Sequence, residues 1–120
     1  MNTEYLIKSQ NIMHRFLANG MEVYFEANHF APIVSIQVMV KVGSIDEEDQ
    51  EAGIAHVLEH MLFKGTKKYP LVGQVASTVE LHGGDINAYT TFDHTNYHLT
   101  APSHFTKQGC ELLLDVVQNS

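Results

Sequence analysis

Hydrophobic and polar residues alternate along several parts of the chain, as they do in strands that bury one face. The alternation is clearest where every second residue from Val34 to Val42 is Val or Ile. Strands are therefore predicted over residues 11–18, 21–26, 33–42, 85–91 and 95–100. The pair Asn19-Gly20 predicts a two-residue hairpin turn between the first two strands, and the last two form a second hairpin.

Three other segments repeat their apolar residues at helical spacing. One ends near Lys64-Gly65, one covers residues 71–81 after Pro70, and one covers residues 104–118. No internal repeat is present. Helices packed on one face of a mainly antiparallel sheet are the natural solution for this order, so the predicted fold class is α+β (β-β-β-α-α-β-β-α).

The composition is that of one globular domain. Of 120 residues, 44% are hydrophobic and 18% are charged, so the chain is long enough to bury a core. The formal net charge of −7 argues against a nucleic-acid partner. The single cysteine, Cys110, excludes an internal disulfide, and no segment approaches transmembrane length, so no membrane partner is expected. Residues 1–10 are interpreted as an N-terminal extension without signal-peptide features, which leaves both the cytoplasm and the periplasm open.

The candidate chemistry lies in the segment His56-Val57-Leu58-Glu59-His60. On a helix with about 100° per residue, His56, Glu59 and His60 share one side, and apolar residues form the other side. Two His one turn apart can bind one Zn²⁺ ion, and a carboxylate between them can take a proton from a water molecule. The order His-x-x-Glu-His is the inverse of the commoner His-Glu-x-x-His zinc helix.

Other interpretations of these residues stay open at this point. The chain has 8 His, so a chance pair on a buried helix is one alternative. The acidic residues at 46–51 precede the helix, where they suit its dipole, and attraction of a cationic peptide is the alternative. A structural zinc module is disfavoured, because such sites have four ligands and are often rich in cysteine.

The residues around the histidine pair resemble a known signature. Residues 43–47, Gly-Ser-Ile-Asp-Glu, and residues 53–66, Gly-Ile-Ala-His-Val-Leu-Glu-His-Met-Leu-Phe-Lys-Gly-Thr, resemble the zinc site of pitrilysin-type (M16, inverzincin) metallopeptidases, especially the bacterial processing-peptidase-like members. Residues 83–90, Gly-Gly-Asp-Ile-Asn-Ala-Tyr-Thr, resemble the strand that follows the zinc helices in that family. The resemblance covers about residues 11–120, which are interpreted as an incomplete N-terminal metallopeptidase domain.

This resemblance implies a zinc-dependent metalloendopeptidase that hydrolyses short unfolded peptides. His56 and His60 would bind Zn²⁺, and Glu59 would be the general base. Asn87, Ala88 and Tyr89 would help to hold an extended peptide substrate as an added strand at a sheet edge. The alternative for Asn87 is a side chain at a turn exit that satisfies nearby backbone, and for Tyr89 it is packing across the hairpin.

A catalytic zinc site normally has three protein ligands. The resemblance places the third, a Glu, roughly seventy to eighty residues beyond His60, which is past Ser120. The chain is therefore expected to be an N-terminal piece of a longer peptidase, inactive alone and prone to self-association, which needs a second homologous domain or a partner subunit. A non-catalytic pitrilysin-like binding or scaffold subunit is the alternative, and it is disfavoured because such members usually lose motif residues.

Overall fold

The computed structural model describes residues 12–120 of the chain. These residues belong to two compact units, which divide between Ala31 and Pro32 and are described separately. The first contains strands β1 (Ile12–Phe16) and β2 (Glu22–Glu26), and the second contains the other three strands and all the described helices. No helix among the described residues is long and apolar enough to cross a membrane.

The first unit is the predicted hairpin, but with a longer turn. β1 and β2 pair antiparallel, and the N–H of Leu17 bonds to the carbonyl of Met21 at 2.8 Å. Three residues therefore form the turn, and the prediction of a two-residue Asn19-Gly20 turn is wrong. Gly20 has φ +85°, which closes a three-residue loop in the left-handed conformation. Asn19 still acts in the turn, because its side-chain oxygen accepts a bond from the N–H of Met21.

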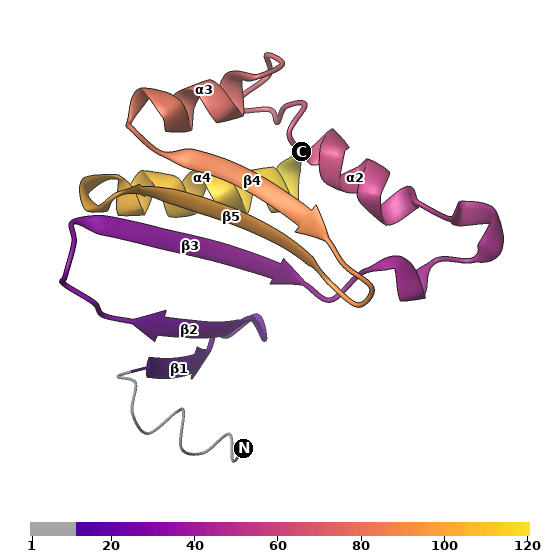
Figure 1. The fold of residues 1–120 in the computed structure, drawn as a ribbon, viewed down its shortest axis with the longest axis horizontal. Coiled ribbons are helices and arrows are strands. Elements are labelled where there is room, and N and C mark those ends of the chain that lie inside the picture. Colours follow the sequence, from indigo (N-terminus) through magenta and orange to yellow (C-terminus); the bar gives the residue numbers. More distant parts are fainter. Residues whose placement is uncertain (1–11) are drawn as a thin grey trace. The chain divides into compact units, whose positions relative to one another are not determined.

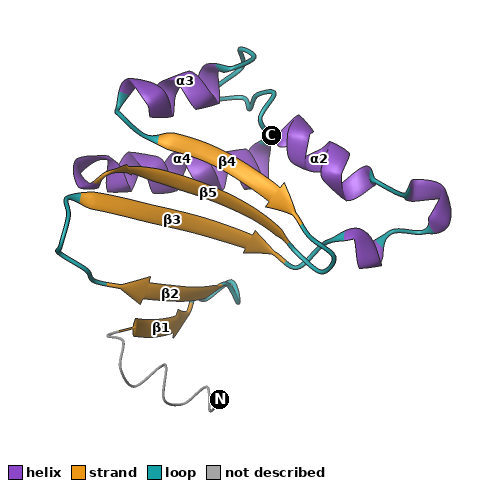
Figure 2. Ribbon diagram, viewed as in Figure 1, coloured by secondary structure: helices purple, strands orange, loops and turns teal. Residues whose placement is uncertain are grey.

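The second unit is built on a three-stranded antiparallel sheet in the order β3-β5-β4 (Figures 1 and 2). β3 covers Ile33–Val40, β4 covers Asp85–Thr90 and β5 covers Thr95–Pro102. The predicted hairpin of β4 and β5 is confirmed, and β5 lies in the middle because it also pairs with β3. β4 is consequently an edge strand among the described residues, with its outer backbone groups unpaired by any other strand.

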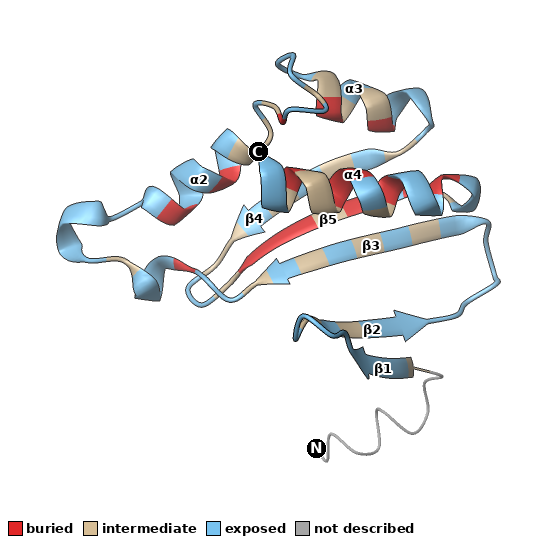
Figure 3. Ribbon diagram, turned by 180° about the vertical axis from the view of Figure 1, so that it is seen from behind, coloured by how far each residue is buried: buried red, intermediate tan, exposed pale blue. Residues whose placement is uncertain are grey.

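Three helices pack on one face of this sheet: α2 (Ile54–Leu62), α3 (Gln74–Leu81) and α4 (Thr106–Asn119). Figure 3 shows that the buried residues concentrate on β5 and on the side of α4 that faces it. The core side chains are Val75, Val79, Tyr97, Leu99, Ala101, Phe105, Leu112, Leu113 and Val116. The α+β class, with antiparallel strands and helices on one face, is therefore confirmed.

The loop that follows α2 is tied to the last helix by a buried hydroxyl. Thr66 is 6% exposed, and its Oγ1 donates a 2.7 Å hydrogen bond to Oδ2 of Asp115 on α4. The same hydroxyl oxygen accepts bonds from the N–H groups of Lys68 and Tyr69. The end of α2 is thus fixed to the core helix by polar bonds as well as by the packing of Leu62 and Phe63.

Candidate metal and peptide-binding site

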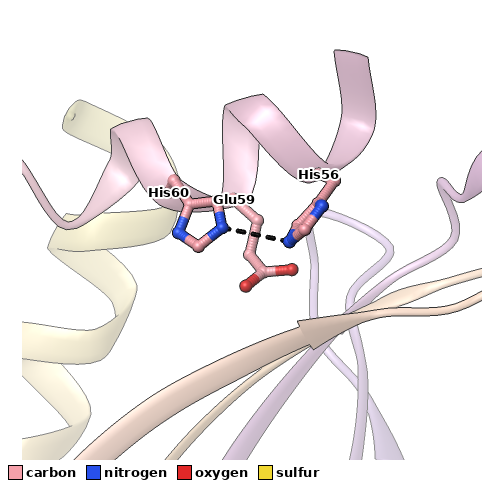
Figure 4. A group of neighbouring side chains, drawn as sticks. All are labelled: His56, Glu59 and His60. Atoms are coloured by element: carbon pink, nitrogen blue, oxygen red, sulfur yellow. Dashed lines mark hydrogen bonds between the residues drawn. The ribbon is translucent and has the colours of Figure 1, made fainter. Parts of the chain in front are cut away.

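The two histidines and the glutamate of α2 project from the same side of the helix (Figure 4). The Nε2 atoms of His56 and His60 are 3.0 Å apart and share a hydrogen bond, which requires one ring to donate and the other to accept. Both rings are exposed, whereas Glu59 is only 6% exposed. The predicted helical face therefore exists, and it combines one buried carboxylate with two accessible imidazoles.

Glu59 on this side of α2 faces the sheet, and most of the apolar side faces outward, although Leu62 at the end of the helix packs on the core. Ile54, Val57, Leu58 and Met61 are between 53% and 59% exposed in this chain. An amphipathic helix ordinarily buries its apolar side. Here Glu59 is buried together with Ala55, and its carboxylate accepts a hydrogen bond from the hydroxyl of Thr90 on β4. The sequence pattern predicted the two sides of α2 but not which of them the sheet covers.

The acidic segment before α2 holds the start of the helix. The two carboxylate oxygens of Glu47 accept bonds from the N–H groups of Gly53 at 2.7 Å and Ala55 at 2.8 Å. These N–H groups have no partner within the helix, so the carboxylate satisfies them. The bonds from Gly53 and then Ala55 lower the pKa of Glu47 below its ordinary value. For Glu47, the interpretation as a helix-start residue is therefore confirmed.

Glu47→Gln is expected to destabilise the domain in a pH-dependent way. Because the pKa of Glu47 is lower in the folded chain, its carboxylate stabilises the fold fully above its ordinary pKa of 4.5. That contribution is lost as the pH falls through the lower folded-state pKa. Urea unfolding at several pH values should show the wild type more stable than the variant at pH 7, with a gap that closes in acid. A gap that is constant with pH would contradict the role of the charge.

A strap at residues 43–46 docks on the turn between β4 and β5. The N–H groups of Ser44 and Ile45 bond to the carbonyls of Thr91 and Phe92 at 3.2 and 2.8 Å. A Cβ atom on Gly43 would lie 2.5 Å from both carbonyl oxygens, so only glycine fits this approach. The strap therefore attaches the segment that leads into α2 to the turn that follows β4.

A cleft of about 660 Å³ lies between α2, the strap and β4. All six of the predicted site residues line it: His56, Glu59, His60, Asn87, Ala88 and Tyr89. They come from two elements about thirty residues apart in the chain, and the α2–β4 packing brings them together. The other lining residues are Ser44, Glu47, Gly53, Thr90, Thr91 and Phe92. The first four lie in the segments that carry the family resemblance, whereas Thr91 and Phe92 lie outside those segments.

The outer edge of β4 forms one wall of this cleft. The N–H of Thr91 bonds to the carbonyl of His94, so in the alternating antiparallel pattern Ala88 directs its backbone groups away from β5. The N–H of Ala88 donates a 2.8 Å hydrogen bond to the side-chain oxygen of Asn87. Asn87 therefore does satisfy nearby backbone, as the alternative interpretation had it, but from the middle of a strand and not from a turn exit.

The two tyrosines near the cleft occupy different environments. Tyr89 is 46% exposed, and its ring centroid lies 6.0 Å from those of both His94 and His98. Tyr97 is 3% exposed and packs on Phe63 with ring centroids 6.1 Å apart. Burial, and then the negative charge of Glu59, raise the pKa of Tyr97. Tyr97 is thus a core residue beneath the site, whereas Tyr89 is accessible at its edge.

The donor atoms of the cluster fit a zinc ion. In a tetrahedral site with Zn–N bonds near 2.05 Å, two ligand nitrogens lie roughly 3.3 Å apart. The 3.0 Å between the Nε2 atoms of His56 and His60 is within a few tenths of an ångström of that value. The three potential donor atoms, including a Glu59 oxygen, lie within 4.8 Å of one another. No second group of three such ligands occurs among residues 12–120.

Comparison with known proteins agrees with this geometry. The family described as insulinase (peptidase family M16) matches residues 22–120. The chain belongs to peptidase family M16. Among its most similar relatives, the mitochondrial-processing peptidase subunit beta of Dictyostelium discoideum is 34% identical over 120 residues, which is 100% of this chain and 25% of that protein. The probable zinc protease PqqL of Haemophilus influenzae is 41% identical over 113 residues, or 89% of this chain and 12% of that protein.

Solved structures with similar sequences share the fold. A protease from Helicobacter pylori superposes with a TM-score of 0.86 at 31% identity, over 92% of this chain and 26% of that chain. Pitrilysin superposes with a TM-score of 0.80 at 31% identity, over 91% of this chain and 12% of that chain. This M16 chain therefore spans between 12% and 26% of the length of these four proteins, and it carries the part of their fold described above.

Proposed function

We propose that this M16 chain supplies the zinc-binding and substrate-binding elements of a zinc metalloendopeptidase that cleaves short unfolded peptides. The observation that carries the proposal is the meeting of His56, Glu59 and His60 with the edge of β4 in one cleft. Peptide hydrolysis at a metal uses ligands that hold the zinc ion and a carboxylate that accepts a proton from water. An unpaired strand edge can in addition bind an extended peptide. The similar protein from Haemophilus influenzae is named a probable zinc protease.

In the proposed site, His56 and His60 would hold the zinc ion. Bound zinc would acidify a water molecule and polarise the scissile carbonyl. Glu59 takes the proton from the attacking water and is the general base. Its position supports this role, because it lies between the two imidazoles on α2 and its carboxylate is held close to β4.

The peptide substrate is proposed to add to β4 as a further antiparallel strand. The outward-facing backbone groups of Ala88 would bond to the peptide, which gives affinity without demanding a particular sequence. Asn87 would release the N–H of Ala88 and bond to the peptide in its turn. Tyr89, nearly half exposed beside the cleft, would contact a side chain of the peptide. An extended backbone is a requirement of this mode, so folded proteins are poor substrates.

The proposed enzyme needs more than residues 12–120. Those residues offer two histidines and Glu59, so a third zinc ligand that leaves Glu59 free has to come from elsewhere. The outward apolar side of α2 also calls for a cover, since four large apolar side chains there are more than half exposed. A second homologous domain or a partner subunit would supply both, and one similar protein is named as a subunit. Without it, self-association through α2 is expected.

Removal of zinc from the full-length protein is expected to abolish peptide hydrolysis. The purified protein would be assayed on a quenched-fluorescence unfolded peptide before and after dialysis against a chelator. Activity should fall to background and return with one equivalent of Zn²⁺ per site, as measured by atomic emission. Zinc that binds with no hydrolysis of any peptide in a random library would favour the non-catalytic binding subunit. Hydrolysis that survives chelation would contradict the proposal.

A further inference from the structure

We propose that Thr90 is a positioning residue for the general base: its hydroxyl fixes the carboxylate of Glu59 and couples it to the strand that holds the substrate. This inference rests on the proposed function, because it gives Glu59 the role of base. The observation behind it is the hydrogen bond from Oγ1 of Thr90 to Oε2 of Glu59. The bond joins two elements whose residues are 31 positions apart in the sequence.

The bond is of a kind that restricts a side chain strongly. Glu59 is 6% exposed, so water does not compete freely for its carboxylate. A hydroxyl that donates to an ionised carboxylate makes a charge-assisted bond, about twice as strong as one between neutral groups. Oε2 is held by Thr90, and Oε1 is left as the oxygen that receives the proton. The long flexible side chain of the base is therefore held at its far end.

Thr90 lies between residues whose positions are fixed by hydrogen bonds. It is the last residue of β4 and pairs with the buried Thr95 of β5. The side chain of Thr95 donates a 2.9 Å bond to the carbonyl of Val42, two residues beyond the end of β3. The next residue, Thr91, closes the turn through its N–H and the carbonyl of His94 at 2.7 Å. A β-branched side chain on such a backbone has few rotamers, so its hydroxyl is a fixed point.

In this arrangement β4 positions both the base and the substrate, so this one strand sets the distance between Glu59 and the bound peptide. A peptide added to β4 takes its register from the backbone of residues 86–90, and the base takes its position from the side chain of Thr90. Displacement of a catalytic group by about 1 Å can cost roughly 100-fold in rate. Loss of the hydroxyl should therefore slow the chemical step and leave the binding of peptide and metal nearly unchanged.

The experiment compares Thr90→Val and Thr90→Ser in the full-length protein. Val keeps the β-branched shape without the hydroxyl, and Ser keeps the hydroxyl. Thr100→Val is the matched control, because Thr100 is exposed and lies on the opposite face of the same sheet. We expect kcat of Thr90→Val to fall about 10- to 100-fold with KM within about threefold. The Ser variant should return to within about threefold of wild type, and zinc affinity by chelator competition should be unchanged in all variants.

Several results would overturn the inference. A Thr90→Val enzyme with wild-type kcat would show that the hydroxyl does not hold the base. A parallel loss of zinc affinity or of folding in Thr90→Val and Thr90→Ser would show a structural role only. If wild type loaded with zinc hydrolyses no peptide, the proposed function itself fails and the inference falls with it. An active wild type with an unaffected Thr90→Val variant overturns the inference alone.

Discussion

Glu59→Gln is expected to remove peptide hydrolysis from the full-length protein and to leave its zinc in place. A glutamine has nearly the same shape, and its amide oxygen can still accept the bond from Thr90. It cannot take a proton from water, and loss of a general base costs about 10²- to 10⁴-fold in rate. kcat on an unfolded peptide should fall by that factor, while zinc content by atomic emission stays at one ion per site.

Glu80→Gln is the matched control for this change, because Glu80 is an exposed glutamate on α3, outside the cleft. It should keep wild-type kcat. The zinc measurement separates two roles of Glu59, since its carboxylate oxygen is close enough to both imidazoles to act as a ligand itself. If Glu59→Gln loses zinc together with activity, Glu59 is a metal ligand and not the base. Turnover within a few-fold of wild type would remove it from the mechanism.

His56→Ala is expected to lose zinc binding outright. The two nitrogens 3.0 Å apart are the only imidazole pair of the cluster, and removal of one leaves a single histidine on α2. Changes to groups that merely support a metal ligand cost about 10- to 100-fold in affinity, so loss of a ligand itself should cost more than about 100-fold. Titration with zinc against a coloured chelator measures this directly in the full-length protein.

His104→Ala controls for the loss of any histidine, because His104 is exposed and lies outside the cleft. Its zinc affinity should equal that of wild type. Circular dichroism should show that His56→Ala stays folded, since His56 is exposed and its ring supports no core packing. Wild-type zinc affinity in a folded His56→Ala protein would place the metal site elsewhere.

Much of the fold could be predicted from the period of the hydrophobic residues. The strict alternation from Val34 to Val40 matches the half-buried face of β3, and the helical stripe with Leu112 and Val116 matches the buried side of α4. The period of the hydrophobic residues does not predict the order of the strands in the sheet, however. That β5 lies between β3 and β4 depends on pairing across about sixty residues, and no local pattern reports such pairing.

The part of the candidate site that lies on α2 could be predicted from helical geometry. The spacing of His56, Glu59 and His60 alone places them on one side of α2, as observed. That side meets the sheet where Glu59 accepts a hydrogen bond from Thr90, and a threonine in a strand gives no sequence signal of such a contact. Val57 and Leu58 lie on the opposite side of the helix and are more than half exposed, which the apolar pattern alone does not predict.

The edge of β4, which no other described strand covers, affects the tendency of this chain to aggregate. An unpaired strand edge that accepts a peptide also accepts the edge of another copy, which is how many proteins begin to aggregate. In this chain the side chain of Asn87 folds back onto the N–H of Ala88, so that donor is already engaged. A second copy has to displace this internal partner before it can pair there. The side chain of Asn87 therefore protects the edge of β4 from pairing with another copy, while a peptide that displaces it can still bind there.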